Sequence, residues 1–443
     1  MSTMNLPRNL GNDLVLRTAV PADRESLIAF NSKIHAEISE QENSETIGAW
    51  THDLLNGKHP TVSVKDFTVV EHKPGHKIVS SVCLISQTWA YGGIPFAVGR
   101  PELVGTDPAF RKRGLVRTQF DVIHKWSRER GQSMQVITGI PYYYRQFGYE
   151  MCLSMHEGRG GYLSDIPPVK GEETCRIRPA ANADIPFIRS LYRQSEERSL
   201  VSCTRNDAQW RYELAGKSRQ NITRMEFRII ETKAGEPVGF FAHPFELWRS
   251  RLVIQACEIR QNTSWLPGLQ AVLQYIKTAG KALAENTPGR SFHSFAFLLG
   301  EEHPVYDVIP DYLPVKRHPY AWYVRIDDIP AFLRLITPVL EQRLASSPLA
   351  KHTGKLKYSF YRDGAELIFE LGKIKSIAPY SPTRSEDGDA LFTMPTFLQL
   401  LLGYRSLEEL EYAYADCYAC NNRGKALTQV LFPKKPSCIL ALA

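Results

Sequence analysis

The stretch TDPAFRKRGLVRTQFDVIHKW, from Thr106 to Trp126, decides the fold of the first part of the chain. After Gly114, hydrophobic residues recur at helical spacing, at Val116, Phe120 and Ile123, which predicts an amphipathic helix. A glycine before a helix lets the backbone turn tightly, so that amide N–H groups and the positive end of the helix dipole face one point. The stretch therefore predicts an anion-binding loop at a helix N-terminus.

Four cations surround this glycine in the sequence: Arg111, Lys112, Arg113 and Arg117. Positive charges at a helix N-terminus oppose the helix dipole and are unfavourable unless an anion lies nearby. A basic helix start that faces only water is the alternative interpretation. We favour a phosphate-binding loop, because guanidinium groups match the charge and geometry of a diphosphate.

The composition is that of a folded protein with several domains. The chain has 443 residues, of which 43% are hydrophobic and 23% are charged, and its length predicts two to four domains. A net charge of +7 is mild for a dedicated duplex-DNA binder and suits an anionic small molecule equally well. The start of the chain lacks a signal-peptide pattern, and no apolar run is long enough to span a membrane. The eight cysteines are scattered, so we expect a reducing, cytoplasmic setting.

Two segments of the chain begin alike. LVLRTAVPADRESLIAFNSKI starts at Leu14, and CRIRPAANADIPFIRSLYRQS starts at Cys175. Each reads as a short strand with an arginine, a turn that reaches an Ala-Asp pair, and a helix. A second pair of similar segments, residues 141–149 and 304–312, supports an internal repeat. The sequence therefore predicts two copies of one fold, the second without an arginine-rich loop before its helix at residues 266–285.

Turn and strand patterns divide the chain further. Residues 65–108 contain short β-rich runs separated by KPGH and YGG, which predicts an antiparallel meander. The linker GRGGYLSDIPPVKGEET favours a domain boundary near residue 165. A third region, from about Val324, predicts a helix broken near Pro338, a hairpin at RDG and further helices. We predict domains at residues 1–165, 166–323 and 324–443.

The order of strand ELVGTDP, loop RKRGLV, helix, strand QVITGI and segment YYYRQFGY resembles the acetyl-coenzyme-A-binding core of the GNAT acyltransferase superfamily. Its motif is Arg or Gln, two residues, Gly, one residue, then Gly or Ala. Arg111 and Gly114 match it, and Val116 replaces the final small residue. Over nearly the full length the chain resembles the Eis-like acetyltransferases. The resemblance implies a mixed α+β fold with two tandem GNAT-fold domains, the second without a cofactor loop, and a sterol-carrier-protein-like C-terminal domain.

The resemblance also implies an activity, namely acetyl-CoA-dependent transfer of an acetyl group to a primary amine by direct attack on the thioester. A small-molecule amine, an aminoglycoside-like compound or a lysine side chain would be the acceptor. The resemblance implies a homo-oligomer, and we expect neither a nucleic-acid partner nor a metal. Coenzyme A would be bound by backbone and side chains of Leu103, Val104, Gly105, Thr106, Arg111, Lys112, Arg113, Gly114, Leu115, Val116 and Arg117.

Acyl transfer from a thioester requires an acid for the leaving thiolate. The general acid of Eis-like enzymes lies in a Tyr-x-x-Phe-Gly-Tyr pattern, which Tyr144 and the residues up to Tyr149 reproduce, so Tyr144 is the predicted acid. A tyrosine with a pKa near ~10 is close in acidity to a thiol. We expect the neighbouring Tyr142, Tyr143 and Tyr149 to pack as core or cleft aromatics.

The general base is left open among several groups. In Eis-like enzymes the terminal carboxylate of the chain reaches the active site, which would make Ala443 the candidate. Glu102, at the start of the cofactor strand, could act directly or through water, and a surface carboxylate is its alternative interpretation. His35 and Glu37 are further options.

Other patterns predict ordinary packing. Cys417 and Cys420 form a C-x-x-C without a second pair at zinc-like spacing, and His243 reads as a buried polar residue in a strand. Two other functions remain as alternatives. One is a non-catalytic acyl-CoA or lipid sensor or carrier that uses the C-terminal domain, and the other is a nucleic-acid binder whose affinity would fall steeply with salt.

Overall fold

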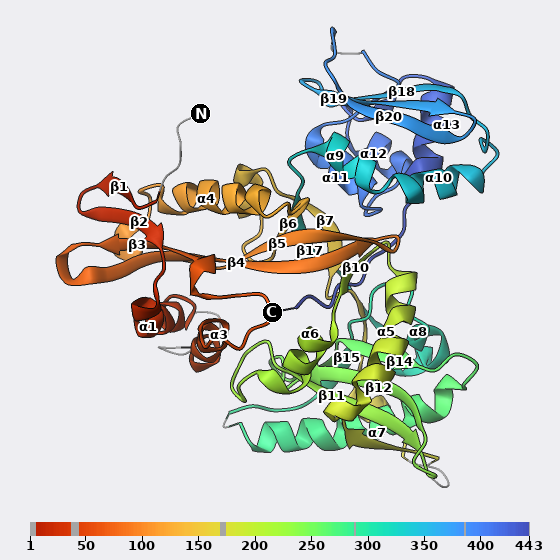
Figure 1. Ribbon diagram of the computed structural model, residues 1–443. Helices are drawn as coiled ribbons and strands as arrows, with labels where there is room; N and C mark the ends of the chain where they lie inside the picture. Colours follow the sequence, from red (N-terminus) through yellow and green to blue (C-terminus); the bar gives the residue numbers. More distant parts are fainter. Residues whose placement is uncertain (1–5, 37–43, 169–173, 288, 385–386, 443) are drawn as a thin grey trace.

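The computed structural model describes residues 6–36, 44–168, 174–287, 289–384 and 387–442. These residues form four β-sheets flanked by helices (Figure 1), which confirms the prediction of a mixed α+β fold. Within the same ranges, none of the helices has the length and apolar character that crossing a bilayer requires.

A nine-stranded sheet forms the centre of the first part of the chain. Its order is β1-β2-β3-β4-β5-β6-β17-β7, and β10 pairs with β4. Helices α1 and α3 cover one face and α4 covers the other (Figure 1). The strands are β1 (Arg8–Gly11), β2 (Leu14–Thr18), β3 (Phe67–His72), β4 (Lys77–Tyr91), β5 (Ile94–Thr106), β6 (Met134–Ile137), β7 (Glu150–Met155), β10 (Val201–Thr204) and β17 (Tyr320–Arg325); the helices are α1 (Arg24–Ile34), α3 (Glu45–Leu55) and α4 (Leu115–Glu129).

The predicted meander is confirmed as the antiparallel strands β3, β4 and β5. Strands β4 and β5 are joined by Gly92 and Gly93, whose φ angles are 52° and 87°. Two positive φ angles in a two-residue hairpin turn match the right-handed twist of the strands, and glycine adopts them without steric cost. The YGG turn therefore sets the register of the two longest strands of this sheet.

Two four-stranded sheets form the second part of the chain, in the orders β14-β12-β11-β9 and β13-β15-β8-β16. The segment LVIQACEIR, residues 252–260, forms two strands that break at Gln255 and join different sheets. The strands are β8 (Gly158–Tyr162), β9 (Cys175–Pro179), β11 (Met225–Thr232), β12 (Pro237–Pro244), β13 (Arg251–Ile254), β14 (Ala256–Ile259), β15 (Ser294–Phe297) and β16 (Val315–Arg317); the helices are α5 (Ile185–Arg198), α6 (Asp207–Arg211), α7 (Trp265–Glu285) and α8 (Val305–Val308).

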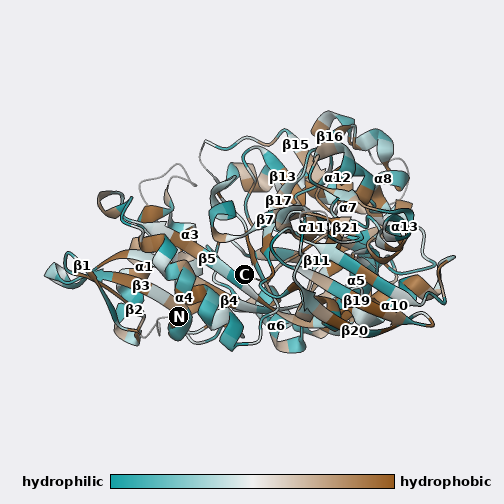
Figure 2. Ribbon diagram, turned by 90° about the horizontal axis from the view of Figure 1, so that it is seen from above, coloured by the Kyte–Doolittle hydropathy of each residue, from teal (hydrophilic) through white to brown (hydrophobic). Residues whose placement is uncertain are grey.

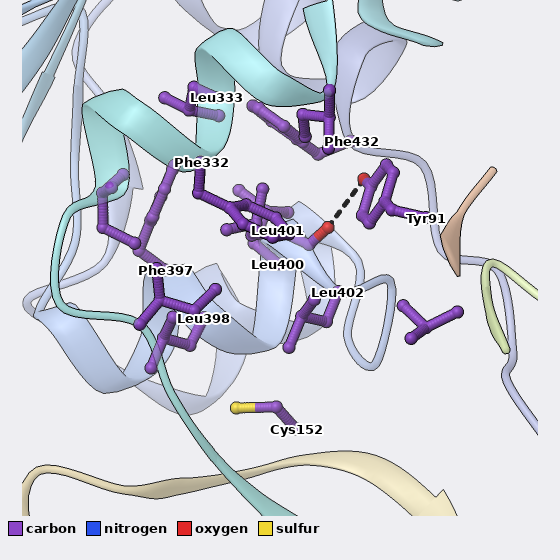
Figure 3. Close-up of a cluster of buried hydrophobic side chains, with 14 of the residues drawn as sticks. Tyr91, Cys152, Phe332, Leu333, Phe397, Leu398, Leu400, Leu401, Leu402 and Phe432 are labelled. Carbon is purple, nitrogen blue, oxygen red and sulfur yellow. Dashed lines mark hydrogen bonds between the residues drawn. The ribbon is translucent and has the colours of Figure 1, made fainter. Parts of the chain in front are cut away.

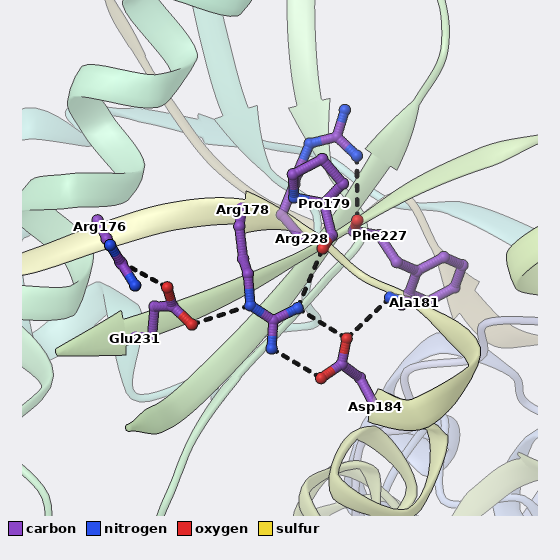
Figure 4. Close-up of polar contacts among 8 residues, drawn as sticks. All are labelled: Arg176, Arg178, Pro179, Ala181, Asp184, Phe227, Arg228 and Glu231. Carbon is purple, nitrogen blue, oxygen red and sulfur yellow. Dashed lines mark hydrogen bonds and ion pairs between the residues drawn. The ribbon is translucent and has the colours of Figure 1, made fainter. Parts of the chain in front are cut away.

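The same polar network occurs at the start of both predicted copies. Each network joins an arginine on a strand, an aspartate six residues later at the start of a helix, and a glutamate on the neighbouring strand (Figure 4 shows the second). The two sets are Arg17, Asp23 and Glu71, and Arg178, Asp184 and Glu231. In each set the aspartate also accepts a hydrogen bond from a backbone N–H three residues before it. The shared geometry supports the interpretation of the two segments as copies.

Two strands near the predicted domain boundaries at residues 165 and 323 pair with strands of the other part of the chain. Strand β8, from the first part of the chain, pairs with β15 and β16 of the second part. Strand β17 comes from the second part of the chain and lies between β6 and β7 in the first sheet. The two parts of the chain therefore exchange a strand in each direction, and the division into three domains stays a prediction.

The third part of the chain has a five-stranded sheet in the order β20-β19-β18-β21-β22. The predicted RDG hairpin is confirmed between β18 and β19, and the predicted break near Pro338 separates α9 from α10. The strands are β18 (Gly354–Ser359), β19 (Gly364–Glu370), β20 (Lys373–Tyr380), β21 (Ala390–Leu391) and β22 (Tyr418–Ala419); the helices are α9 (Ile329–Leu335), α10 (Thr337–Ala345), α11 (Met394–Leu401), α12 (Leu407–Ala413) and α13 (Asn422–Leu431).

This third part packs directly on the first sheet. Leucine and phenylalanine side chains of α9, α11 and the segment after α13 form one buried cluster with Tyr91 and Cys152 of the first sheet (Figure 3). The hydroxyl of Tyr91 donates a hydrogen bond to the carbonyl of Leu401 at 2.8 Å. A shared apolar core of this kind couples the two parts mechanically, because separating them would expose it to water.

After α13 the chain returns to the centre of the molecule (Figures 1 and 2). The backbone N–H of Leu200 donates to the carbonyl of Pro436, and that of Val201 donates to the Ser437 hydroxyl, both at 3.0 Å. Leu442 is buried. The C-terminal segment, defined here as residues 435–442, therefore lies between the first sheet and the second part of the chain.

Candidate active site

Strands β5 and β6 separate where the predicted cofactor strand begins. They pair in parallel through Val98 and Gly99 alone among the described residues. Further along β5, Leu103 has a φ of 52° at an irregularity in the pairing with β4. The edge of β5 from Leu103 to Thr106 consequently faces an open space instead of a neighbouring strand, and backbone amides on that edge are available to a ligand.

The predicted anion-binding loop lies at the mouth of this space. Gly114, just before α4, has a φ of 74° and a ψ of 10°, which is the left-handed region that favours glycine. A Cβ atom at this position would meet no atom within 4 Å. The backbone conformation, not lack of space, therefore requires the glycine.

None of the four cations around Gly114 forms an ion pair within the described ranges. Arg113 donates to the carbonyl of Ala109 at 3.2 Å, and Arg117 donates to the Gln146 side-chain oxygen at 2.8 Å. These neutral partners leave the positive charge unbalanced next to the positive end of α4. An anion is the partner that this arrangement lacks.

A cavity of about 900 Å³ joins the separated strands to the loop. All of the predicted cofactor-binding residues line it, from Leu103 to Thr106 and from Arg111 to Arg117. Tyr144 and Glu102 line it as well. We call this space the donor cavity.

Tyr144 lies in the 3₁₀ turn Tyr143–Phe147 and is buried against Phe120 and Tyr323. Its hydroxyl makes no hydrogen bond to the part of the chain that the structure describes. Burial raises the pKa of Tyr144, and the negative charge of Glu102 adds to the shift. The phenol therefore stays protonated at neutral pH and can donate a hydrogen bond into the donor cavity.

The neighbouring tyrosines differ in their surroundings. Tyr149 is buried, and its hydroxyl lies 3.0 Å from Nε2 of His124. Tyr143 lines the donor cavity, whereas Tyr142 is 71% exposed. Of the four tyrosines in this segment, Tyr144 alone combines burial with a hydroxyl that is available to the cavity.

The predicted base candidates lie in different places. Glu102 forms an ion pair of 2.7 Å with Arg100. His35 lines the donor cavity next to Gly105, its Nε2 atom is buried without a hydrogen-bond partner, and burial lowers its pKa. Ala443 and Glu37 lie outside the described residues.

The C-terminal segment is held beside Glu102. The carbonyl of Leu442 accepts hydrogen bonds from Arg100, at 2.9 Å, and from the side chain of Gln87. Arg205 donates to the carbonyl of Leu440. Three side chains from β4, β5 and the second part of the chain therefore fix the last described residues near Glu102.

A second cavity, of about 490 Å³, shares Trp50, Glu102 and Thr138 with the donor cavity. Its walls come from the first sheet, the second part of the chain and the C-terminal segment. A molecule in this second cavity would meet a molecule in the donor cavity at the three shared residues. Sequence reasoning missed Trp50 and Thr138, because nothing in their local sequence indicates that these two side chains reach a common wall.

Helix α3, which carries Trp50, is anchored to the second part of the chain by Asp53. Its buried carboxylate accepts hydrogen bonds of 2.7 Å from the backbone N–H of Ser218 and from the side chain of Asn221. Burial alone would raise the pKa of Asp53, but these hydrogen bonds outweigh it and the net pKa is lowered. The wall between the two cavities therefore depends on a charged carboxylate.

The other sequence patterns lie outside the donor cavity and the second cavity. Cys417 is buried in the large core cluster. His243 is buried, with one ring nitrogen 2.7 Å from the carbonyl of Pro244 and the other 2.9 Å from the Tyr275 hydroxyl. Across the described ranges, histidine, cysteine and acidic side chains do not gather in groups of three that could hold a metal ion.

Residues 34–152 match the family model described as acetyltransferase (GNAT) domain. The protein is an acetyltransferase with a GNAT domain. The matched range includes β3 to β6, helix α4 and the turn that carries Tyr144, so it supplies every described side chain that was predicted to bind the donor. GNAT domains use acetyl-CoA and act on amines.

Solved structures of similar fold extend over nearly the whole chain. A probable N-acyltransferase from Enterococcus faecalis is 16% identical with a TM-score of 0.64, and covers 96% of this chain and 97% of its own. A GCN5-related N-acetyltransferase from Anabaena variabilis is 14% identical with a TM-score of 0.64, over 96% and 99% of the two chains. Eis1 from Mycobacterium abscessus is 12% identical with a TM-score of 0.55, over 96% and 98%. At these identities the likeness shows the fold alone. No curated protein matches by sequence.

Proposed function

We propose that the protein transfers the acetyl group of acetyl-CoA to a primary amine by direct attack on the thioester. The donor cavity carries this proposal. Four cations without acidic partners among the described residues, a helix N-terminus and an unpaired strand edge line one space of about 900 Å³. A diphosphate with an extended polar arm is the ligand chemistry that these three features fit together.

Each part of the donor would meet a different feature of the cavity. The diphosphate would lie at the amides of Arg113 to Leu115, with the guanidinium of Arg111 or Arg117 beside it. The amide arm would add hydrogen bonds along the free edge of β5, as a further strand would. The thioester would then lie between β5 and Tyr144, where the two strands diverge.

In the reaction, the amine nitrogen attacks the thioester carbonyl, a C–N bond forms, the C–S bond breaks and the amine loses a proton. Backbone N–H groups of β5 would stabilise the negative charge that develops on the carbonyl oxygen. Tyr144 would donate a hydrogen bond, and then its proton, to the leaving sulfur. Because burial raises the pKa of Tyr144, the phenol is a weaker acid than usual. Tyr144 would therefore stabilise the leaving sulfur more by its hydrogen bond than by complete proton transfer.

Glu102 is the base that we favour for the amine. Among the described candidates, Glu102 lines both cavities and His35 lines only the donor cavity. The ion pair with Arg100 orients the carboxylate, and one water molecule could bridge it to the amine. Ala443 remains a candidate through the resemblance, and the anchored carbonyl of Leu442 is consistent with it.

We also propose that the second part of the chain is a GNAT-like copy without a cofactor loop and that the third is sterol-carrier-protein-like. The repeated arginine networks support the first assignment. A non-catalytic lipid carrier is disfavoured by the interior of the third part. Its centre is filled by Tyr358, Phe397 and Phe432, whose rings lie 5.2–5.9 Å apart.

The test is release of coenzyme A from acetyl-CoA in the presence of an amine panel, followed with a thiol reagent. We expect amine-dependent release that is lost in an Arg111→Gln, Arg113→Gln double variant. Arg128→Gln, on the exposed far end of α4, is the matched control and should keep wild-type activity. Measurable coenzyme A binding without amine-dependent release would favour the sensor. Polynucleotide binding at low salt that coenzyme A displaces would favour the nucleic-acid binder.

A further inference from the structure

The second cavity would hold the acceptor if the proposed function is right. It meets the donor cavity at Glu102 and is closed on one side by the C-terminal segment. An amine that enters it would present its nitrogen to the thioester at the shared wall. The chemistry of the remaining walls therefore selects the acceptor.

Most of the charge in this cavity is already neutralised by the protein. Its acidic residues are Glu102, Glu157 and Glu213. Glu102 pairs with Arg100 at 2.7 Å, and Glu213 pairs with the buried Lys217 at 3.0 Å. These pairs balance the charge of both carboxylates and leave little attraction for additional cations, although the buried Oε1 of Glu213 has no hydrogen-bond partner among the described residues.

Glu157 differs from the other two, because it forms no ion pair with any described residue. It is half-buried between the cavity and a small neighbouring pocket. Burial raises its pKa, the charge of Glu301 adds to this, and Ser154, Lys316 and Lys434 act against it. Glu157 is therefore a carboxylate that a cationic group of a ligand could pair with.

The other walls are mostly apolar. Two tryptophans and several aliphatic side chains contribute to them: Trp50, Ile222, Met225, Leu298, Trp322 and Ile439. Ammonium or hydroxyl groups pressed against such walls would lose their hydration without gaining partners. An aromatic or alkyl body would instead gain from leaving water.

We infer that the acceptor is an amphiphilic amine, with the reacting amine on an aryl or alkyl body and at most one further cationic group, which Glu157 binds. A polycationic amino sugar does not fit, since it would bring several charged groups to a cavity in which Glu157 is the one described carboxylate without an ion pair. Glu157 is thus a specificity-determining residue. The inference rests on the proposed acetyl transfer.

The test compares acceptors of matched length. n-Octylamine and 1,8-diaminooctane differ only in a terminal ammonium group, and kanamycin represents the polycationic sugars. We expect kcat/KM for both C8 amines to exceed that for kanamycin at least tenfold. Glu157→Gln should lower kcat/KM for the diamine about tenfold and leave that for octylamine within twofold. Glu301→Gln, which removes a neighbouring carboxylate outside the cavity lining, should change neither.

The outcomes separate the inference from the function. Kanamycin preferred over octylamine, or an equal effect of Glu157→Gln on both C8 amines, would overturn the inference and leave the acetyltransferase proposal intact. If no amine releases coenzyme A, the proposed function fails, and calorimetric titration of the coenzyme A complex then tests the cavity directly. Diamine binding that weakens in Glu157→Gln would support the cavity assignment, and no binding of either C8 amine would remove it.

Discussion

Replacing Gly114 with alanine should weaken coenzyme A binding by about 5- to 30-fold. The glycine has a φ of 74°, and a Cβ atom there would meet nothing within 4 Å. No clash contributes, so the cost is that of placing an L-residue in the left-handed region, ~1–2 kcal/mol. Because the loop is exposed, it can relax to another conformation in the free protein, and binding then has to restore the strained one. The 5- to 30-fold range is this backbone cost of ~1–2 kcal/mol converted to a ratio of dissociation constants.

Gly131 provides a matched control at the opposite end of α4. It has a φ of 65° and equally open surroundings, but it does not line the donor cavity. Gly131→Ala should therefore carry a similar backbone cost and leave coenzyme A affinity unchanged. Gly114→Asn should lie between wild type and Gly114→Ala, because asparagine tolerates the left-handed region.

The assay is calorimetric titration of coenzyme A, with the free energy of unfolding measured on the same variants in urea. A Gly114→Ala variant whose affinity stays within twofold of wild type would refute the argument that the left-handed turn shapes the anion site. An equal loss of affinity in Gly131→Ala would refute it as well, because the effect would then be a general weakening of α4.

Tyr144→Phe should lower kcat by roughly 10²- to 10³-fold while coenzyme A affinity stays within about threefold, with Tyr143→Phe as the control. Because burial raises the pKa of Tyr144, the phenol stays protonated in alkaline solution. The rate should therefore not decline through ionisation of Tyr144 as the pH rises to about 9. A decline in that range would argue against Tyr144 as the acid. Asp53→Ala should lower the free energy of unfolding at pH 7 by roughly 2–3 kcal/mol in urea titrations. Since the folded-state pKa of Asp53 is lowered, its contribution is present above the unfolded pKa of ~3.9 and is lost as the pH falls through the folded value, so variant and wild type should converge there. Arg17→Met should lower the free energy of unfolding by about 1–2 kcal/mol, and Arg178→Met should lower it somewhat less, because the side chain of Arg178 is 36% exposed and that of Arg17 is 22% exposed. An Arg17→Met variant as stable as wild type would contradict the structural role of the network.

Local patterns in the sequence were sufficient wherever neighbouring residues fix the backbone. The glycine before α4, the two glycines after Tyr91 and the break at Pro338 each act through their own φ angle, and all three are where the sequence predicts them. The repeat was visible for the same reason, since its arginine and aspartate lie six residues apart. The charge of the anion loop needed no tertiary information.

The strand exchange could not be predicted in this way. Strands β8 and β17 contain ordinary β-rich residues, and their partners depend on which sheet edge is open when the two parts of the chain meet. Similarly, the β-rich run at residues 252–260 is divided into two strands because its two halves bond to different neighbours. The choice of neighbouring strand leaves no periodic pattern in the sequence of these segments.

The sequence by itself determined the side of the molecule that we propose to bind the donor: a basic loop, a left-handed glycine, a helix start and a tyrosine turn, all within residues 102–149. Only the tertiary structure decided the proposed acceptor side. Trp50, Glu157 and the C-terminal segment line one cavity although they are far apart in the chain. The physical reason is that an anion site can be made from consecutive amides and charges, whereas an apolar cavity is the space left between packed elements, and its walls exist only after the chain has folded.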